Sequence, residues 1–421
     1  MRPALPLATI LLLLMPPSIA RAAELRLTAN VGYDLISQEF FADSLTGAGA
    51  DSSVVEWQLR KNYLDDLRAS FSAQYFPFDD RRVELRPSYE QSQEFQRIRM
   101  NTNLRLPVKG SRFDLITELE MKRRYRNTAS VGDNYLLGTL RTRFTTPLST
   151  STKGWAQLRG DFVSFDSTSD YIYSYQRGGA AIGLSHSIRD YTFVDVELFV
   201  NSLTAPDSSQ LDYVNPGLSA SFMNIGRRGS FDLYFRAENR DYNQPNEEDD
   251  HFRVNLQLRN KFETSDKTYM RQEADIELVR HAPADLTHFS YSIFRAEAVF
   301  GLTIGNSQIG LGPAVGFLSD GSTVMGGSQE YKEISLKGEL DYLHVGRLFL
   351  SVESFTGRRN YGTDSEFQSD FTFERISLIG DLQIARGISY NLLYSTEWEW
   401  HDSGYDDSHI DLLSTSLSYA F

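Results

Sequence analysis

Apolar and polar residues alternate along this chain over many segments of about ten residues. Successive side chains of a β-strand point to opposite faces of the sheet, so this alternation predicts strands with one apolar and one polar face. The pattern is clearest at 25–33, 67–75, 97–106, 252–259, 333–342 and 388–399. The chain is therefore predicted to be all-β.

The length of these segments distinguishes two all-β architectures. A soluble sandwich also alternates, but its strands usually have about 5–6 residues, whereas several segments here are about twice as long. A tilted strand needs about 9–11 residues to cross a bilayer. Strand length therefore favours a transmembrane barrel over a sandwich.

The connections between the segments alternate in length. Compact turns are predicted at 108–110, 187–189, 225–227, 264–266, 305–306, 344–346 and 385–387. Longer polar segments lie at 125–133, 203–210, 240–250, 281–287, 318–330, 357–369 and 401–409. This predicts one antiparallel barrel with short turns at one end and longer loops at the other. An even number of strands is expected, about 18, with 16 and 20 as the neighbouring possibilities, because residues 53–95 cannot be paired clearly.

Composition excludes several classes of protein. The 42 Lys and Arg against 56 Asp and Glu give a net charge of −14, which argues against binding a nucleic-acid backbone. The absence of Cys excludes disulfides, cysteine zinc sites, iron–sulfur clusters and thiol catalysis. A mean hydropathy of −0.37 excludes a bundle of membrane helices. The 22 Tyr and 27 Phe are many for so polar a chain, and they are expected to face lipid while the charged residues face water.

The first 22 residues are predicted to be a secretory signal peptide. Arg2 precedes a short apolar run, and small residues end the segment at Ala20-Arg21-Ala22, so cleavage is expected after Ala22. A membrane anchor is the alternative, but the apolar run is interrupted by prolines and is too short to span a bilayer. Residues 23–421 then form the barrel.

The last residues of the chain form another two-faced strand. Its apolar face consists of Leu413, Thr415, Leu417, Tyr419 and Phe421. An exported chain that ends on such a strand, with a terminal Phe, resembles a bacterial outer-membrane β-barrel. The resemblance implies location in the outer membrane, contact with lipid and lipopolysaccharide, periplasmic short turns, and recognition of the last strand by the barrel-insertion machinery. It leaves open whether the protein forms a homo-oligomer.

Aromatic residues at strand ends are expected to lie at the two membrane interfaces, as in the aromatic girdles of membrane barrels. The residues predicted to do so are Tyr75, Phe76, Trp398, Trp400, Tyr419 and Phe421.

Charged residues fill the polar faces, which are expected to line the lumen. Six arginines on neighbouring segments are candidates for selectivity, with two acidic residues on the segment between them: Arg97, Arg99, Arg105, Arg141, Arg143, Arg159, Glu118 and Glu120. One hypothesis is a basic ladder that lowers the electrostatic barrier to anions. The alternative is a network of ion pairs that braces the wall without selecting a solute.

Catalysis, metals and cofactors have weak support in the sequence. Asp407 and His409 would be the best catalytic pair, but no catalytic or phosphate-binding motif is present. Acidic clusters at 247–250 and at Asp402, Asp406 and Asp407 lack the spacing of a calcium loop, so they are expected to be solvated loops. The chain is predicted not to be an enzyme and to hold no metal or cofactor.

The predicted function is a porin-like channel for passive passage of small hydrophilic solutes, among them anions, or of an exported polymer. A structural barrel without transport is the alternative, and an outer-membrane hydrolase is a more distant one.

Overall fold

The computed structural model describes residues 24–420 except for eleven gaps, at 47–53, 77–81, 92–94, 125–133, 167–172, 207, 244–249, 282–289, 321–329, 362–368 and 403–406. Within the strands, the side chains of 24–25, 36–46, 54–66, 73–76, 82–83 and 320 are not described, nor is that of 210 in the 3-10 helix. The predicted signal peptide, Phe421 and the side chains of Tyr75 and Phe76 therefore lie outside what the structure describes. Among the described residues no helix is both long and apolar enough to span a membrane.

The described chain folds into twenty β-strands and one short 3-10 helix, η1 (Ser209–Leu211). The first ten strands are β1 (Glu24–Thr46), β2 (Val54–Phe76), β3 (Arg82–Gln91), β4 (Phe95–Val108), β5 (Ser111–Arg124), β6 (Tyr135–Pro147), β7 (Thr152–Phe165), β8 (Tyr175–Arg189), β9 (Thr192–Thr204) and β10 (Tyr213–Gly226). The others are β11 (Gly229–Tyr242), β12 (His251–Ser265), β13 (Thr268–His281), β14 (Tyr291–Ile304), β15 (Ser307–Asp320), β16 (Tyr331–His344), β17 (Leu348–Tyr361), β18 (Phe371–Ala385), β19 (Ile388–His401) and β20 (Ser408–Ala420).

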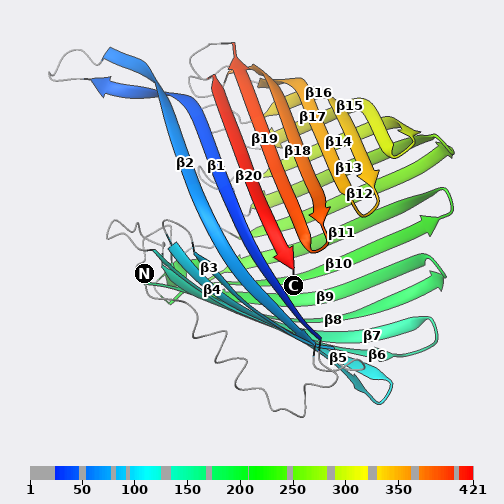
Figure 1. The fold of residues 1–421 in the computed structure, drawn as a ribbon. Coiled ribbons are helices and arrows are strands. Elements are labelled where there is room, and N and C mark those ends of the chain that lie inside the picture. Colours follow the sequence, from blue (N-terminus) through cyan, green and yellow to red (C-terminus); the bar gives the residue numbers. More distant parts are fainter. Residues whose placement is uncertain are drawn as a thin grey trace.

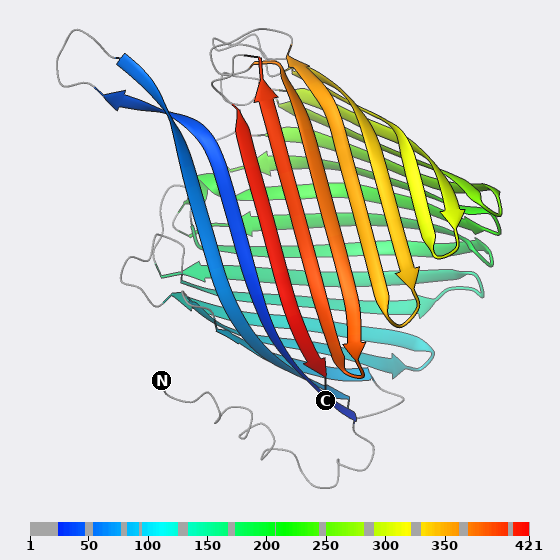
Figure 2. The same ribbon diagram turned by 45° about the horizontal axis from the view of Figure 1, so that its top comes forward.

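The strands form one closed antiparallel barrel. Each strand pairs with its neighbours in the sequence, and β1 closes the sheet by pairing with both β2 and β20 (Figure 1). The short turns lie at one end of the barrel and the longer connections at the other, as Figure 2 also shows. The all-β barrel predicted from alternation is confirmed.

The prediction of about 18 strands is short by one hairpin. The predicted connections omit a turn at 148–151 and the connection that follows Phe165. The turn contains Ser149 but neither Gly nor Asn. The backbone N–H of Leu148 donates to the carbonyl of Thr152 at 2.9 Å, and the N–H of Thr152 donates to the Ser149 hydroxyl at 3.0 Å. Serine and threonine supply the bonds that close this turn, so the usual glycine signal is missing.

Residues 53–95 lack a clear pairing pattern because β2 and β3 meet over a short stretch. Their register runs from Ala69 opposite Gln91 to Tyr75 opposite Leu85, and Pro87 lies within β3. Proline cannot donate to a strand ladder and is confined to weakly paired positions. The hairpin β1–β2 has 23 residues in each strand, and β1 continues beyond Phe40, the last residue paired with β20.

Contacts between strands that are not neighbours identify the inner face. Arg159 on β7 donates to Asn201 on β9, and Tyr269 on β13 donates to Glu339 on β16. Side chains reach across a strand in this way only on the concave face, where they converge. The polar rows therefore line the lumen, and the apolar rows face outward. The structure places Trp398 and Trp400 on the outward row near the longer connections, and Tyr419 on the outward row near the short turns.

Leu158 and Gln157 provide a test of these two faces. Leu158 is 62% exposed on the outward face of β7, and Gln157 is on the inward row. Leu158→Arg is expected to lower the free energy of unfolding by about 2–4 kcal/mol, because a charge on the lipid side of a barrel loses its hydration. Gln157→Arg is expected to change it little. Urea titration of both variants in lipid vesicles, followed by gel mobility, measures the difference; equal effects would contradict the assignment.

Candidate functional site

The three predicted arginines of β4 are paired with acidic residues in the lumen. Arg97 lies 3.0 Å from Glu90 and 3.1 Å from Glu120, Arg99 lies 3.1 Å from Glu118, and all five are on inward rows. Arg105 is 2.9 Å from Asp114 in the same way. This part of the wall has the arrangement of the bracing hypothesis, in which each guanidinium is compensated by carboxylates.

The three predicted arginines of β6 and β7 lie in a different environment. Arg141, Arg143 and Arg159 face the lumen, and within the described chain none of them forms an ion pair. Arg143 stacks on the ring of Trp155, 4.0 Å from its centroid, and Arg159 donates to the amide oxygen of Asn201 at 2.8 Å. Arg143 and Arg159 are thus held by neutral partners. We call all three arginines uncompensated because no carboxylate of the described residues lies within ion-pair distance of them, and carboxylates act on Arg143 and Arg159 only at longer range.

Trp155 supports Arg143 from a small cluster of inward residues. Its ring is 8% exposed and packs with Ala181 and Phe199, and Phe199 in turn lies under Arg236 at 4.3 Å. The ring also covers Gly183 on β8, where a Cβ atom would collide with it and with the carbonyl oxygen of Val196. Glycine at 183 is therefore required for the observed position of the Trp155 ring, and that ring in turn positions Arg143.

Gly183→Ala tests this arrangement. The added methyl group is expected to displace the Trp155 ring and to lower the free energy of unfolding by about 1–3 kcal/mol, as overpacking does. Gly178→Ala, on the outward row of the same strand, is the control, because its Cβ would meet only the Ser202 hydroxyl at 3.8 Å. Tryptophan fluorescence and urea titration of the two variants measure the effect. Identical spectra and stabilities for both would refute it.

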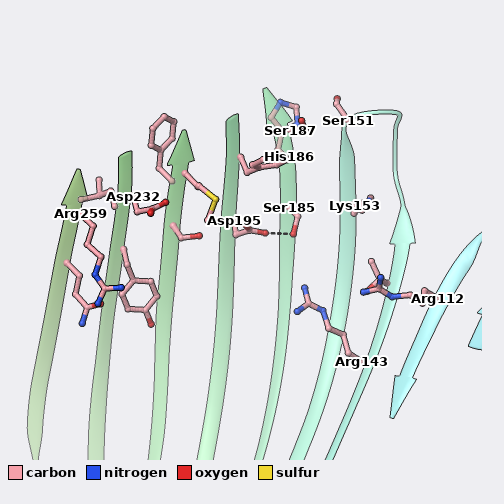
Figure 3. Close-up of a pocket in the computed structure, with 18 residues that line it drawn as sticks. Arg112, Arg143, Ser151, Lys153, Ser185, His186, Ser187, Asp195, Asp232 and Arg259 are labelled. Atoms are coloured by element: carbon pink, nitrogen blue, oxygen red, sulfur yellow. Dashed lines mark hydrogen bonds between the residues drawn. The ribbon is translucent and has the colours of Figure 1, made fainter. Parts of the chain in front are cut away.

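A pocket of about 620 Å³ lies in the wall between β5 and β12, beside the short turns. Figure 3 shows Arg112 and Arg143 at one side, Asp232 and Arg259 at the other, and Asp195 with Ser185 between them. The Ser185 hydroxyl donates to the Asp195 carboxylate. Three buried polar atoms at this pocket have no hydrogen-bond partner among the residues that the structure describes: Arg143 Nε, Thr145 Oγ1 and Asp232 Oδ1. A polar solute that reaches this pocket meets cationic groups and unsatisfied hydrogen-bonding groups together.

The opposite wall, β13 to β17, carries a buried ionic network. The Lys337 ammonium lies 2.7 Å from Glu297 and 3.8 Å from Glu353. Arg271 pairs with Glu339, which also accepts a 2.8 Å hydrogen bond from the Tyr269 hydroxyl. The lumen thus has a wall with uncompensated arginines in β6–β7 and a wall of compensated, acid-rich ion pairs facing it across the barrel.

Aromatic side chains also occur inside the barrel, which corrects the expectation that they face only lipid. Register places a series of rings on the inward rows at the strand ends next to the longer connections. We call these rings the mouth belt: Tyr135, Phe165, Tyr175, Tyr213, Tyr242, His251, His281, Tyr291, Tyr331, Tyr361, Phe371 and His401. The physical reason is that aromatic rings can also be accommodated on the inner rim of a wide barrel, where they pack against each other and against arginine side chains.

No protein-family model matches the chain, and no curated protein matches its sequence. Solved structures resemble it in fold. The copper transporter OprC superposes with a TM-score of 0.54 at 10% identity, covering 95% of this chain and 81% of OprC. The siderophore receptor PirA from Pseudomonas aeruginosa gives 0.51 at 10% identity, over 94% of this chain and 80% of PirA. OccK2 (OpdF) from Pseudomonas aeruginosa, solved with glucuronate, gives 0.51 at 11% identity, over 95% of this chain and 98% of OccK2.

The chain has the fold of bacterial outer-membrane β-barrels. At these identities the likeness concerns the fold, so the solute and the selectivity depend on the lumen of this barrel. With twenty strands the barrel exceeds the 16 to 18 that already leave an aqueous channel. No strand of the described chain packs against a strand on the far side of the barrel.

The predicted catalytic candidates are not brought together. Asp407 accepts a hydrogen bond from the backbone N–H of His401 at 2.7 Å, whereas His409 contacts Asp411 at 3.1 Å and stacks on Trp398. Both His409 and Asp411 point outward, on the face opposite to the lumen charges. Among the described residues no three His, Asp or Glu side chains gather as a metal site.

Proposed function

We propose that this protein is an outer-membrane channel through which small hydrophilic solutes diffuse, with a preference for anions. The observation that carries the proposal is the set of uncompensated lumen arginines, Arg141, Arg143 and Arg159, of which Arg143 lines the pocket described above. Positive side chains along a pore lower the electrostatic barrier to anions and raise it for cations. The paired arginines of β4 add little to this field, because their acidic partners cancel them at short range.

Two structures of similar fold support the solute class. OccK2 was solved with glucuronate and OpdK from Pseudomonas aeruginosa with vanillate, and both of these solutes are carboxylates. A guanidinium binds a carboxylate through parallel N–H donors, which gives Arg143 and its neighbours the chemistry for such solutes.

The proposal includes the route and setting of the protein. We expect export through a signal peptide cleaved after Ala22, insertion guided by the last strand, and contact of the outward rows with lipid and lipopolysaccharide. The longer connections would then face the outside of the cell, and the short turns the periplasm. Whether the barrels associate as homo-oligomers is to be measured by cross-linking in the membrane.

Swelling of proteoliposomes tests passive diffusion. Vesicles that contain the folded protein are expected to swell in isosmotic solutions of small sugars and faster in those of a carboxylate of similar size, such as gluconate. Empty vesicles and vesicles with heat-unfolded protein are the controls. Swelling rates no higher than those of empty vesicles would overturn the proposal.

A further inference from the structure

The rings of the mouth belt form continuous rows across neighbouring strands. In one row, ring centroids are 5.5 Å apart between Tyr213 and Tyr242, 6.4 Å between Tyr242 and His251, and 5.0 Å between His251 and His281. These four residues occupy four successive strands, β10 to β13. All four are half-buried, so part of each ring faces the lumen. The row presents one ring per strand at nearly even spacing.

A second row lies across β16 to β19. Tyr331 and Tyr361 are 6.1 Å apart between centroids, Tyr361 and Phe371 are 6.3 Å apart, and Phe371 and His401 are 4.7 Å apart. Phe371 is 3% exposed and serves as packing, whereas Tyr331 and Tyr361 are half-buried. The same arrangement of rings thus occurs at two places on the rim.

Arginines are fixed against both rows. The Arg240 guanidinium lies 4.5 Å from the Tyr213 centroid and donates to the Tyr242 hydroxyl at 3.4 Å. The Arg359 guanidinium lies 4.3 Å from the Tyr331 centroid and is held by Glu333 at 2.6 Å. Each row therefore combines flat apolar faces with planar hydrogen-bonding groups whose orientation is set by their neighbours.

This combination matches one class of solute. A pyranose ring offers a face of C–H groups that packs on an aromatic ring, and hydroxyls at its edge that pair with planar donors and acceptors such as guanidinium and carboxylate. A chain of such rings repeats at about the distance between adjacent strands, so successive sugar units can contact successive side chains. An apolar peptide or a lipid would displace water from Arg240 and from the Arg359–Glu333 pair without hydrogen-bonding their remaining donors and acceptors, which is costly.

We propose that the mouth belt is an oligosaccharide-binding site at the outer entrance of the channel, with Tyr213 and Tyr242 as stacking platforms and Arg240 as the hydrogen-bonding group between them. The proposal rests on the channel function proposed above, whose solute class it narrows. Because Arg240 forms no ion pair within the described chain, saccharides that carry carboxylates bind its row more tightly than neutral ones.

The test is block of the ion current in a planar bilayer by maltohexaose and by hexagalacturonate. Both are expected to interrupt the current when added to the side of the longer connections, hexagalacturonate at lower concentration. The double variant Tyr213→Ala with Tyr242→Ala is expected to weaken the block about tenfold, since each aromatic stack contributes modestly. Phe252→Ala is the control, because Phe252 adjoins His251 in sequence but is 46% exposed on the outward face.

Two results of the current measurement would overturn the proposal. One is equal block of the wild type and the double variant; the other is equal block by polyethylene glycol or by a polar hexapeptide of similar size. Failure of the channel itself is distinguishable, because calorimetric titration of hexagalacturonate into the folded protein in detergent measures binding without any current. Heat-dependent gel mobility verifies that each variant is folded. No heat of binding in the wild type would also refute the site.

Discussion

Replacing Arg141, Arg143 and Arg159 with alanine is expected to abolish most of the anion preference of the channel. One unit charge about 4 Å from a permeating ion contributes about 1 kcal/mol in water. Removal of three such charges, partly screened by salt, is expected to lower the anion-to-cation permeability ratio roughly five- to tenfold. The reversal potential in a KCl gradient measures this ratio.

The matched control neutralises the three β4 arginines together with one acidic partner of each: Arg97→Ala with Glu90→Gln, Arg99→Ala with Glu118→Gln, and Arg105→Ala with Asp114→Asn. Each pair loses one positive and one negative charge, so the net charge of the lumen does not change. This variant is expected to shift the ratio much less than the β6–β7 variant does. A larger shift from the β4 variant would show that the anion preference comes from the β4 arginines and that the uncompensated arginines do not determine it.

Lys337→Met is expected to lower the free energy of unfolding by about 3 kcal/mol. The Lys337 side chain is 7% exposed and compensates Glu297 at 2.7 Å within the wall of β13–β17. Removing one partner of a buried pair leaves the other charge desolvated and uncompensated, which costs several kcal/mol. Urea titration in lipid vesicles, read by gel mobility or by loss of β-structure in circular dichroism, measures the change.

Two further variants separate the ion pair from the lost side chain. Lys337→Met combined with Glu297→Gln is expected to recover part of the stability, because Glu297, the nearer of the two carboxylates that contact Lys337, then carries no unpaired charge. Lys332→Met, on the outward row of the same strand, is expected to have little effect. Glu297→Gln alone completes the comparison. If it lowers the free energy of unfolding equally in the wild type and in Lys337→Met, the ion pair contributes nothing to stability.

The strand framework followed from the sequence because closure of a membrane barrel imposes a simple period. The alternation at 388–399 coincides with β19, and the turn at Arg386-Gly387 joins β18 to β19. Lipid on one side and water on the other enforce this alternation at every residue. Elements without these constraints do not show the pattern. The turn at 148–151 closes with serine and threonine, and β3 contains Pro87, so neither showed the usual signal.

The sequence predicts which residues face the lumen, because alternate residues of a strand point inward. It does not predict which of these residues lie opposite one another. Arg99 and Arg141 both fall on polar rows, and both do face the lumen. Only the register shows that Arg99 lies opposite Glu120, whereas Arg141 lies between Ile116 and Arg159. Register depends on the stagger of the whole barrel, which no local pattern in the sequence specifies.

The aromatic residues show the same limit. Trp398, Trp400 and Tyr419 occupy outward positions at strand ends, where the girdle was predicted. Tyr213 and Tyr242 also stand at strand ends, but on polar rows, which is a signal visible in the sequence once the parity of each strand is known. Residue type alone could not separate the outer girdle from the inner mouth belt.

Conductance of the refolded protein in a planar bilayer tests the central claim most directly. A water-filled, anion-preferring barrel predicts stepwise increases of current as single channels insert, and a reversal potential of the sign that chloride permeation gives in a KCl gradient. Protein that is folded by gel mobility but produces no current steps would contradict the channel. Current steps with a reversal potential of the opposite sign would contradict the role of the uncompensated arginines.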